Sequence, residues 1–372
     1  MPKGLDNARD GLNVERWQER KSQRQKKPGV AHLLLSYVDS GGHCEMPKNL
    51  TSSKYTMQDT RHNNRIQPTL ESRKNIIQSP LNYTGGKFTL LSQILPLFPK
   101  QISTFVDLFC GGGNVGVNIQ AQNIILNDEN KVVMELLKLF QKEEFAMIKQ
   151  KIDVLINEFK LSNSTKFGYE FYKCDSAKGL SSYNKQGFLN LRKAYNEDKD
   201  ILKLFVLIIF SFNNQIRFNA KGEFNLPYGK RDFNAKMQAK LQGFIQALKS
   251  KNISFKNEDF RTFKLENLDK NAFIYMDPPY FLCLASYNEN KAWSEQDEKD
   301  LLEFIQNLES KNIKFALSNV LTHKGKEHKL LQTWLKENPC FKVHFLNKSY
   351  KNCNYQSKRL ESREVLVVNY GS

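Results

Sequence analysis

A glycine-rich turn that follows an apolar stretch is the most restrictive feature of this sequence. The stretch TFVDLF at 104–109 predicts a short buried strand. The CGGGNVG after it places Gly111, Gly113 and Gly116 in a G-x-G-x-x-G register ahead of a predicted helix. Glycines let the backbone approach a ligand closely, and a following helix directs its free N–H groups at that ligand. The pattern therefore predicts a nucleotide-type binding loop, although a dinucleotide site would share it.

Two acidic residues beside the turn narrow the choice of ligand. Asp107 stands just before the turn, and Asp128 ends the next predicted strand, NIILND at 123–128, where it can bond a ribose diol. Asp128 follows Gly111 so closely that the loop and helix are short for a dinucleotide site. A pyrophosphate would be repelled by Asp107, whereas a sulfonium and an α-amino group would be attracted. These residues favour adenosine that carries a cationic amino acid over NAD.

A lysine upstream of the turn has two interpretations. Lys87 follows a paired-glycine turn in SPLNYTGGK at 79–87. It can fold over the same ligand together with Tyr83 and meet a carboxylate of that ligand. The alternative is a surface loop with a solvated lysine.

Strands alternate with helices along most of the remaining chain, which predicts an α/β fold with a mostly parallel sheet. The block at 145–250 is mostly helix-like and interrupts the alternation, so it is either an insertion or a separate lobe. Further strands are predicted at 253–260, 272–280, 314–319 and 363–370, with helices at 131–145 and 295–312.

The strand at 272–280 ends abruptly in Asp277-Pro278-Pro279-Tyr280. Ligands in open α/β sheets bind outside the carboxyl ends of strands, so Asp277 should lie at the same edge as the glycine turn. Two prolines stiffen the backbone, which makes the carboxylate and a carbonyl a rigid pair of acceptors. Such a pair beside an aromatic ring suits the exocyclic amino group of a nucleobase that has been flipped out of a duplex. Taken alone, the tetrapeptide is equally compatible with a turn and a buried tyrosine.

Composition and charge indicate the partner and the compartment. A net charge of +17 favours a polyanion such as nucleic acid over a merely basic protein. The six cysteines form no C-x-x-C pair, which predicts reduced thiols and no metal site. We expect a cytoplasmic protein without a membrane span, because the N-terminus has no apolar signal region and the longest apolar run covers only 204–210.

Taken together, the segments resemble DNA adenine-N6 methyltransferases of the Dam-type (D12, alpha-order) class. NYTGGK, FVDLFCGGGNVG, LND, NEDF, DPPY, FALSN and REVLVVNY occur in the order typical of that family over about 76–370. The resemblance implies a Rossmann-like sheet of the S-adenosylmethionine-dependent methyltransferase type. It also implies an inserted, mainly helical target-recognition domain.

The expected organisation follows from this resemblance. Residues 76–144 and 251–372 would form the catalytic domain and 145–250 the DNA-binding domain. Residues 1–75 carry 14 Lys/Arg against 8 Asp/Glu with almost no apolar periodicity, which predicts a basic, weakly ordered tail. A small DNA-binding module, or a translation start at Met46 or Met57, are the alternatives for this segment.

The resemblance also implies roles for individual residues, with S-adenosylmethionine as cofactor and no metal. Tyr83 and Lys87 would border the methionine end of the cofactor, Asp107 with Gly111, Gly112 and Gly113 would form its loop, Asp128 would bind its ribose, and Asp259 and Phe260 would hold its adenine. Asp277, Pro278, Pro279 and Tyr280 would form the catalytic motif.

The stretch FNNQIRFNAKGEFNLPYGK at 212–230 resembles the DNA-reading segment of the family. Phe212, with Asn213 beside it, would enter the gap left by a flipped base, and Arg217 would grip a guanine edge or a phosphate. Asn219, Asn225 and Tyr228 also match the family pattern. A core-packed Phe212 and a solvated Arg217 are the alternative. The basic loop at 350–359 either contacts DNA or is solvated.

We therefore expect site-specific methylation of adenine N6 in double-stranded DNA for restriction-modification protection, with a solitary regulatory role as the alternative if no cognate endonuclease exists. Transfer would be direct, without a covalent enzyme intermediate, by a monomer that shares its site with a cognate restriction endonuclease but forms no stable complex with it. Methylation of cytosine N4 or of RNA adenine, and a non-catalytic DNA-binding role, remain alternatives. A glutamine-modifying protein methyltransferase is disfavoured because such enzymes usually carry Asn where Asp277 stands.

Overall fold

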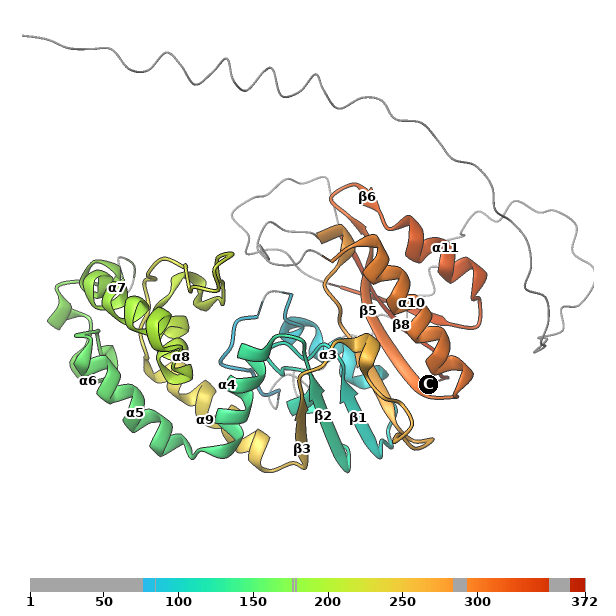
Figure 1. Cartoon of the computed structure of the whole chain (residues 1–372), viewed down its shortest axis with the longest axis horizontal. Coiled ribbons are helices and arrows are strands. Elements are labelled where there is room, and N and C mark those ends of the chain that lie inside the picture. The colour runs from blue at the N-terminus through green and yellow to red at the C-terminus, as the bar shows by residue number, and fades with distance from the viewer. Residues whose placement is uncertain are drawn as a thin grey trace, which may run out of the picture. The chain divides into compact units, whose positions relative to one another are not determined.

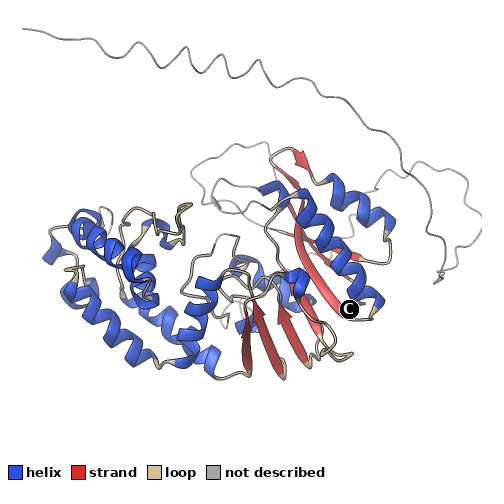
Figure 2. Cartoon of the chain, in the orientation of Figure 1, coloured by secondary structure: helices blue, strands red, loops and turns tan. Residues whose placement is uncertain are grey.

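The computed structural model describes residues 76–83, 85–175, 177, 179–283, 293–347 and 362–371. The tail at 1–75 and the loop at 350–359 discussed above lie outside these ranges. Within them, the strands form a single sheet in the order β3-β2-β1-β4-β5-β8-β7, with β6 paired to β5 (Figures 1 and 2). The strands are β1 (Thr104–Asp107), β2 (Asn123–Asn127), β3 (Ile253–Lys256), β4 (Phe273–Met276), β5 (Lys314–His323), β6 (Lys326–Glu327), β7 (Lys342–Leu346) and β8 (Arg363–Val368).

The sheet is mostly parallel. Strands β1 to β5 pair in parallel, whereas β8 runs antiparallel to both β5 and β7. The central strand β4 is buried along its whole length, as expected for a strand covered on both faces. The predicted α/β class is confirmed, and the sheet is consistent with the S-adenosylmethionine-dependent methyltransferase fold.

Helices cover both faces of the sheet. On one face, α10 (Glu295–Ser310) and α11 (Lys329–Glu337) pack over apolar residues of β1, β4, β5 and β8. On the other, α3 (Leu91–Ile94) and α4 (Lys131–Lys142) share a second cluster with the sheet. Single turns of 3-10 helix occur at η2 (Phe88–Leu90), η3 (Leu95–Leu97), η4 (Gly116–Asn118), η5 (Glu170–Tyr172), η6 (Phe212–Asn214), η7 (Phe260–Thr262) and η8 (Phe281–Cys283).

The helix predicted after the glycine turn is wrong, because the structure has only the three-residue turn η4 there. The Asn118 side chain donates to the Ile77 carbonyl at 2.8 Å and accepts from the Ile77 N–H at 2.8 Å. It also donates to the carbonyl of Asn114. These bonds tie the segment to the chain before η2, and the segment leads directly into β2 instead of continuing as a helix.

The block between β2 and β3 consists of α5 (Phe145–Glu158), α6 (Ser164–Phe167), α7 (Ser181–Asp198), α8 (Ile201–Phe210) and α9 (Ala235–Lys249). The sequence ILKLFVLIIF makes α8 its centre, since every residue from Leu204 to Phe210 is buried. The hydrophobic cluster of the α3–α4 face continues into these helices without a break. The division into separate catalytic and DNA-binding domains therefore stays a prediction. None of the described helices has the length and apolarity needed to cross a membrane.

A buried asparagine joins the carboxyl ends of three strands. Asn127, at the end of β2, donates to the carbonyls of Leu108 and Glu258 at 3.0 Å each and accepts from the Glu258 N–H at 3.1 Å. Leu108 follows β1 and Glu258 follows β3, and neither strand pairs with the other. Asn127 therefore fixes the edge from which the loops of the site emerge.

We expect Asn127→Ala to lower the free energy of unfolding by about 2 to 4 kcal/mol, because it leaves buried backbone groups without partners. Asn123 starts the same strand but is exposed, and its carboxamide oxygen accepts from Asn252. Asn123→Ala should therefore cost less than about 1 kcal/mol. Urea unfolding of both variants measures the difference, and equal losses would contradict the assigned role of Asn127.

Candidate active site at the carboxyl edge of the sheet

Asp128 shapes the glycine turn from the end of β2. Its Oδ2 accepts from the Gly111 N–H at 2.8 Å and its Oδ1 accepts from the Asn130 N–H at 2.9 Å. Gly111 has φ +47°, and a Cβ on it would lie 2.7 Å from Cδ1 of Tyr83. The turn thus requires glycine both for its backbone conformation and for the ring above it. Both oxygens of the predicted ribose acid are engaged with backbone of the turn itself.

Asp107 is a buried carboxylate with one unused oxygen. Only 1% of the residue is exposed. Its Oδ2 accepts from the Gly116 N–H at 3.1 Å, while its Oδ1 is buried and has no hydrogen-bond partner among the described residues. Burial, followed by the nearby charge of Asp277, raises the pKa of Asp107 well above its ordinary value. A cationic group placed beside this oxygen would be strongly favoured.

A buried ion pair connects the segment predicted to border the cofactor with the predicted catalytic motif. Lys87 is 3% exposed, and its Nζ lies 2.7 Å from Oδ1 of Asp277. The same ammonium donates to the Gly85 carbonyl at 3.0 Å and lies 4.6 Å from the centre of the Tyr280 ring. Lys87 is therefore directed at Asp277 and Tyr280 of the predicted catalytic motif, a contact that the sequence did not indicate.

The register of the sheet places the two key carboxylates next to each other. Asp107 ends β1 and pairs in register with Tyr275 of β4, two residues before Asp277. Below the motif, the buried Tyr275 hydroxyl lies 2.8 Å from the Ser318 hydroxyl of β5. Asp277 thus emerges from a fully buried strand at the predicted edge.

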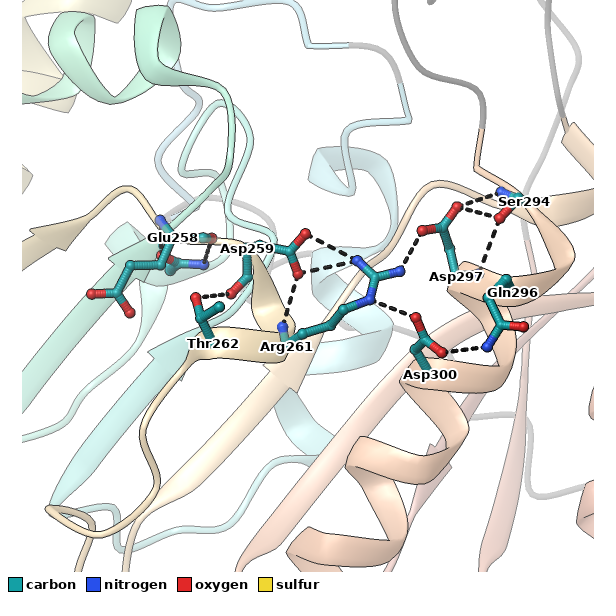
Figure 3. A network of polar contacts seen from close by, with 9 residues as sticks. Glu258, Asp259, Arg261, Thr262, Ser294, Gln296, Asp297 and Asp300 are labelled. Carbon is teal, nitrogen blue, oxygen red and sulfur yellow. Dashed lines mark hydrogen bonds and ion pairs between the residues drawn. The ribbon is translucent and has the colours of Figure 1, made fainter.

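Asp259 lies in a charged network at the end of β3 (Figure 3). Its Oδ1 accepts from the Arg261 N–H at 2.9 Å, and Nη1 of Arg261 donates to both of its oxygens at 3.1 and 2.9 Å. The same guanidinium donates through Nε to Asp300 at 2.6 Å and pairs through Nη2 with Asp297. Because Asp297 and Asp300 belong to the first turns of α10, Arg261 fastens the Asp259 turn to that helix.

Phe212, the predicted DNA wedge, is 52% exposed and begins a turn in a strained conformation. Asn213 and Asn214 both have positive φ, at 56° and 53°, a region that asparagine tolerates better than most residues. The Asn214 side chain donates to the carbonyls of Ile208 and Ile209, and Asn82 donates to the Asn213 carbonyl at 3.1 Å. The turn that presents Phe212 therefore contacts the segment that carries Tyr83 and Lys87.

The other predicted DNA-binding residues help to hold their own loop. Arg217 donates through Nε to Oδ1 of Asn225 at 2.8 Å and through Nη2 to its carbonyl at 3.2 Å. Asn219 accepts from the N–H groups of Lys221 and Glu223, and Tyr228 is half-buried near the Phe188 ring. These contacts define the shape of the loop and leave Phe212 as its exposed ring.

Sequence reasoning missed Asn127 and Arg261. Their side chains bond the loops that carry the site residues, and within the described residues neither forms a hydrogen bond with Asp107 or Asp277. Asn127 directly precedes Asp128 in LND, and Arg261 directly follows the NEDF segment. A position next to a motif was the signal available for both. Neither set of partners can be derived from local spacing.

Comparison with protein families gives an extended match. A family model for D12 class N6 adenine-specific DNA methyltransferases matches residues 83–352. This range contains the glycine turn, the Asp259 turn, the helical block and the catalytic motif.

Individual relatives agree with this match. The chain is 40% identical to the type II methyltransferase M.FokI of Planomicrobium okeanokoites over 356 residues, covering 94% of this chain and 50% of the relative. It is 41% identical to the modification methylase StsI of Streptococcus sanguinis over 307 residues, covering 81% and 44%. A DNA adenine methylase of Salmonella typhi is 26% identical over 247 residues, covering 64% and 79%. The chain spans about half the length of the first two relatives.

We expect the Lys87–Asp277 pair to show strong energetic coupling. Lys87→Met and Asp277→Asn should each lower the free energy of unfolding by about 3 kcal/mol, because each leaves a largely buried charge without its partner. The double variant should recover at least about 2 kcal/mol of the summed loss.

The exposed pair of Lys299 and Glu295 on α10, 2.8 Å apart, provides the control. Its coupling should stay below about 1 kcal/mol. Double-mutant cycles from urea unfolding measure both pairs, and a coupling at Lys87–Asp277 no larger than at this control would refute the assignment.

Proposed function

The chain belongs to the D12 class of N6 adenine-specific DNA methyltransferases, and on that premise we propose that it methylates the exocyclic N6 of an adenine flipped out of double-stranded DNA. The observation that carries this proposal is the position of Asp277-Pro278-Pro279-Tyr280. The motif follows the buried strand β4 directly and lies beside Asp107 and the glycine turn. A rigid acceptor pair is thereby held next to a cradle suited to a cationic adenosine cofactor.

The residues around the glycine turn fit S-adenosylmethionine. The unused buried oxygen of Asp107 suits the α-amino group of its methionine part, next to the backbone of Gly111, Gly112 and Gly113. Asp128 keeps lone pairs for a ribose hydroxyl beyond its two backbone bonds. When bound, the cofactor supplies an electrophilic methyl group on a sulfonium.

The cofactor's adenine belongs at the Asp259 turn. The Asp259 carboxylate, oriented by Arg261, serves as an acceptor for the purine amino group. Phe260, of which only 4% is exposed, supports this turn from within the core.

Asp277 and the carbonyl of Pro278 accept the two N–H groups of the target amine. This withdraws the nitrogen lone pair from the ring and makes N6 a better nucleophile. The Lys87 ammonium pairs with Oδ1 of Asp277 at 2.7 Å, and a carboxylate in such an ion pair acts only as an acceptor. Tyr280, half-exposed above the same ammonium, offers a ring face for the flipped base. Fixed acceptors and positioning supply the rate enhancement, and no cysteine takes part.

Double-stranded DNA is the proposed partner, attracted by the net charge of +17. Phe212 fills the gap in the base stack, and the loop held by Arg217, Asn219, Asn225 and Tyr228 reads the neighbouring base pairs. Because the relatives include a type II methyltransferase and a modification methylase, we assign the activity to restriction-modification protection. The protein would act as a cytoplasmic monomer on a site shared with an endonuclease that it does not stably bind.

We expect Asp277→Ala to reduce methyl transfer by at least about 10³-fold while it retains cofactor binding, because the variant loses the principal acceptor. Transfer of labelled methyl to DNA and calorimetry with the cofactor measure the two properties. Asp269, exposed before β4 and bonded to the Ser103 hydroxyl, is the control. Asp269→Asn should leave transfer unchanged, and wild-type turnover by Asp277→Ala would rule out the mechanism.

Cofactor binding should tighten as the pH rises through the elevated pKa of Asp107. Below that pKa the buried carboxyl is neutral in the free protein, and it must release a proton before it can pair with the cofactor ammonium. Affinity should therefore increase by up to about tenfold per pH unit and then level off. Calorimetry across this range should show a flat and weaker profile for Asp107→Asn. An unchanged slope in that variant would assign the proton to another group.

A further inference from the structure

Three aromatic rings meet where β1, β3 and α10 converge. The centre of the Phe109 ring, just after β1, lies 5.4 Å from that of Phe260, just after β3. The Trp293 ring, just before α10, lies 5.8 Å from Phe109 and 5.7 Å from Phe260. The cluster stands beside Asp259, the acceptor proposed for the purine amino group. Sequence reasoning assigned only Phe260 to this site.

Phe260 is enclosed by its neighbours. The residue is 4% exposed. Cζ of Arg261 lies 4.5 Å from the centre of its ring, and the Phe304 ring approaches it edge-on at 6.1 Å. Phe109 and Trp293 are only partly buried. The ring surface that remains accessible in this cluster therefore belongs to Phe109 and Trp293, with Phe260 behind them.

We propose that Trp293, together with Phe109, forms the aromatic surface against which the adenine of the cofactor packs. This rests on the proposed function, since it identifies a further binding residue for the same cofactor. An indole is a large flat surface for a purine, and stacking between bases and aromatic side chains is a substantial source of affinity. Phe260 supports the two rings from beneath.

A buried polar network holds the Trp293 ring in place. Its Nε1 donates to Oε2 of Glu298 at 2.7 Å. Oε1 of that fully buried carboxylate accepts from Nδ2 of Asn319 at 3.0 Å and lies 3.0 Å from Nε2 of His328. Nδ1 of His328 accepts from the Leu331 N–H at 3.2 Å, so a neutral imidazole carries its proton on Nε2 and donates it to Glu298. The indole is therefore oriented before any ligand arrives.

The start of α10 is fixed as well. Ser294 and Asp297 form a reciprocal capping box immediately after Trp293. Arg261 ties Asp297 and Asp300 to the Asp259 turn (Figure 3). The acceptor for the purine and the ring beside it thus belong to one connected unit.

Intrinsic fluorescence tests this contact without measuring turnover. The chain has three tryptophans, Trp17, Trp293 and Trp334, so the full-length variant Trp17→Phe/Trp334→Phe reports on Trp293 alone. Titration with S-adenosylhomocysteine should change its emission saturably, with the same Kd that calorimetry gives. Binding by calorimetry with unchanged emission would overturn the Trp293 contact and leave the proposed function intact. Absence of any binding by the wild type would overturn both.

Substitutions give a second readout. Trp293→Ala should weaken S-adenosylhomocysteine binding by roughly tenfold, whereas Trp293→Phe should retain most of the affinity. Glu298→Gln, which disturbs the orientation of the ring, should raise Kd by less than Trp293→Ala and leave kcat at saturating cofactor unchanged. Trp334→Phe, at a buried position of α11 that stacks on Phe341, is the control with unaltered Kd. A wild-type Kd for a natively folded Trp293→Ala variant would refute the proposal.

Discussion

The buried ion pair between Lys87 and Asp277 is the contact on which the proposed site depends. Desolvation makes such a pair a poor source of stability, since apolar residues of similar volume often serve as well. The pair instead fixes positions: Lys87 holds the Asp277 carboxylate, the proposed acceptor after β4, and the same ammonium lies against the ring of Tyr280. The pair also links the segment before β1 to the proposed catalytic motif, so it joins the two parts of the chain proposed to contact the cofactor and the target base.

The site gathers acidic side chains, whereas the chain as a whole carries a net positive charge. The carboxylates of Asp107, Asp128 and Asp277 lie at the carboxyl edge of the sheet. The proposed cofactor would bring a sulfonium and an ammonium group to this edge. The chain as a whole is strongly basic, which favours the proposed DNA partner. Fixed polar contacts, those of Asn127 and Glu298 among them, hold this edge without ligand. The arrangement avoids the cost of orienting dipoles during the reaction.

Local sequence pattern was sufficient to place Asp107 and Asp277 at one edge, because strand ends and parallel order follow from periodicity and turn chemistry. It did not predict the features that depend on contacts between distant parts of the chain. Lys87 and Asp277 pair although about half of the chain lies between them. Phe260 belongs to the NEDF segment, but its contacts with Phe109 and Trp293 join distant parts of the chain and no local pattern indicates them. In place of the helix predicted after the glycine turn, the structure has the short turn η4, and the Asn118 side chain bonds to the Ile77 carbonyl. The helices α5 to α9 run from Phe145 to Lys249, within the predicted block at 145–250, but their core is continuous with that of the sheet, so the division into two domains stays a prediction.

The most direct test of the account is the identity of the methylated product. The full chain would be incubated with S-adenosylmethionine carrying a labelled methyl group and with duplex DNA, RNA and protein in parallel. Products would be digested and separated by chromatography with mass detection. The expected result is label in N6-methyldeoxyadenosine from duplex DNA alone. Label in N4-methyldeoxycytidine, in RNA or in protein, or no transfer by the intact chain, would contradict the assignment of Asp277 and its neighbours to adenine N6.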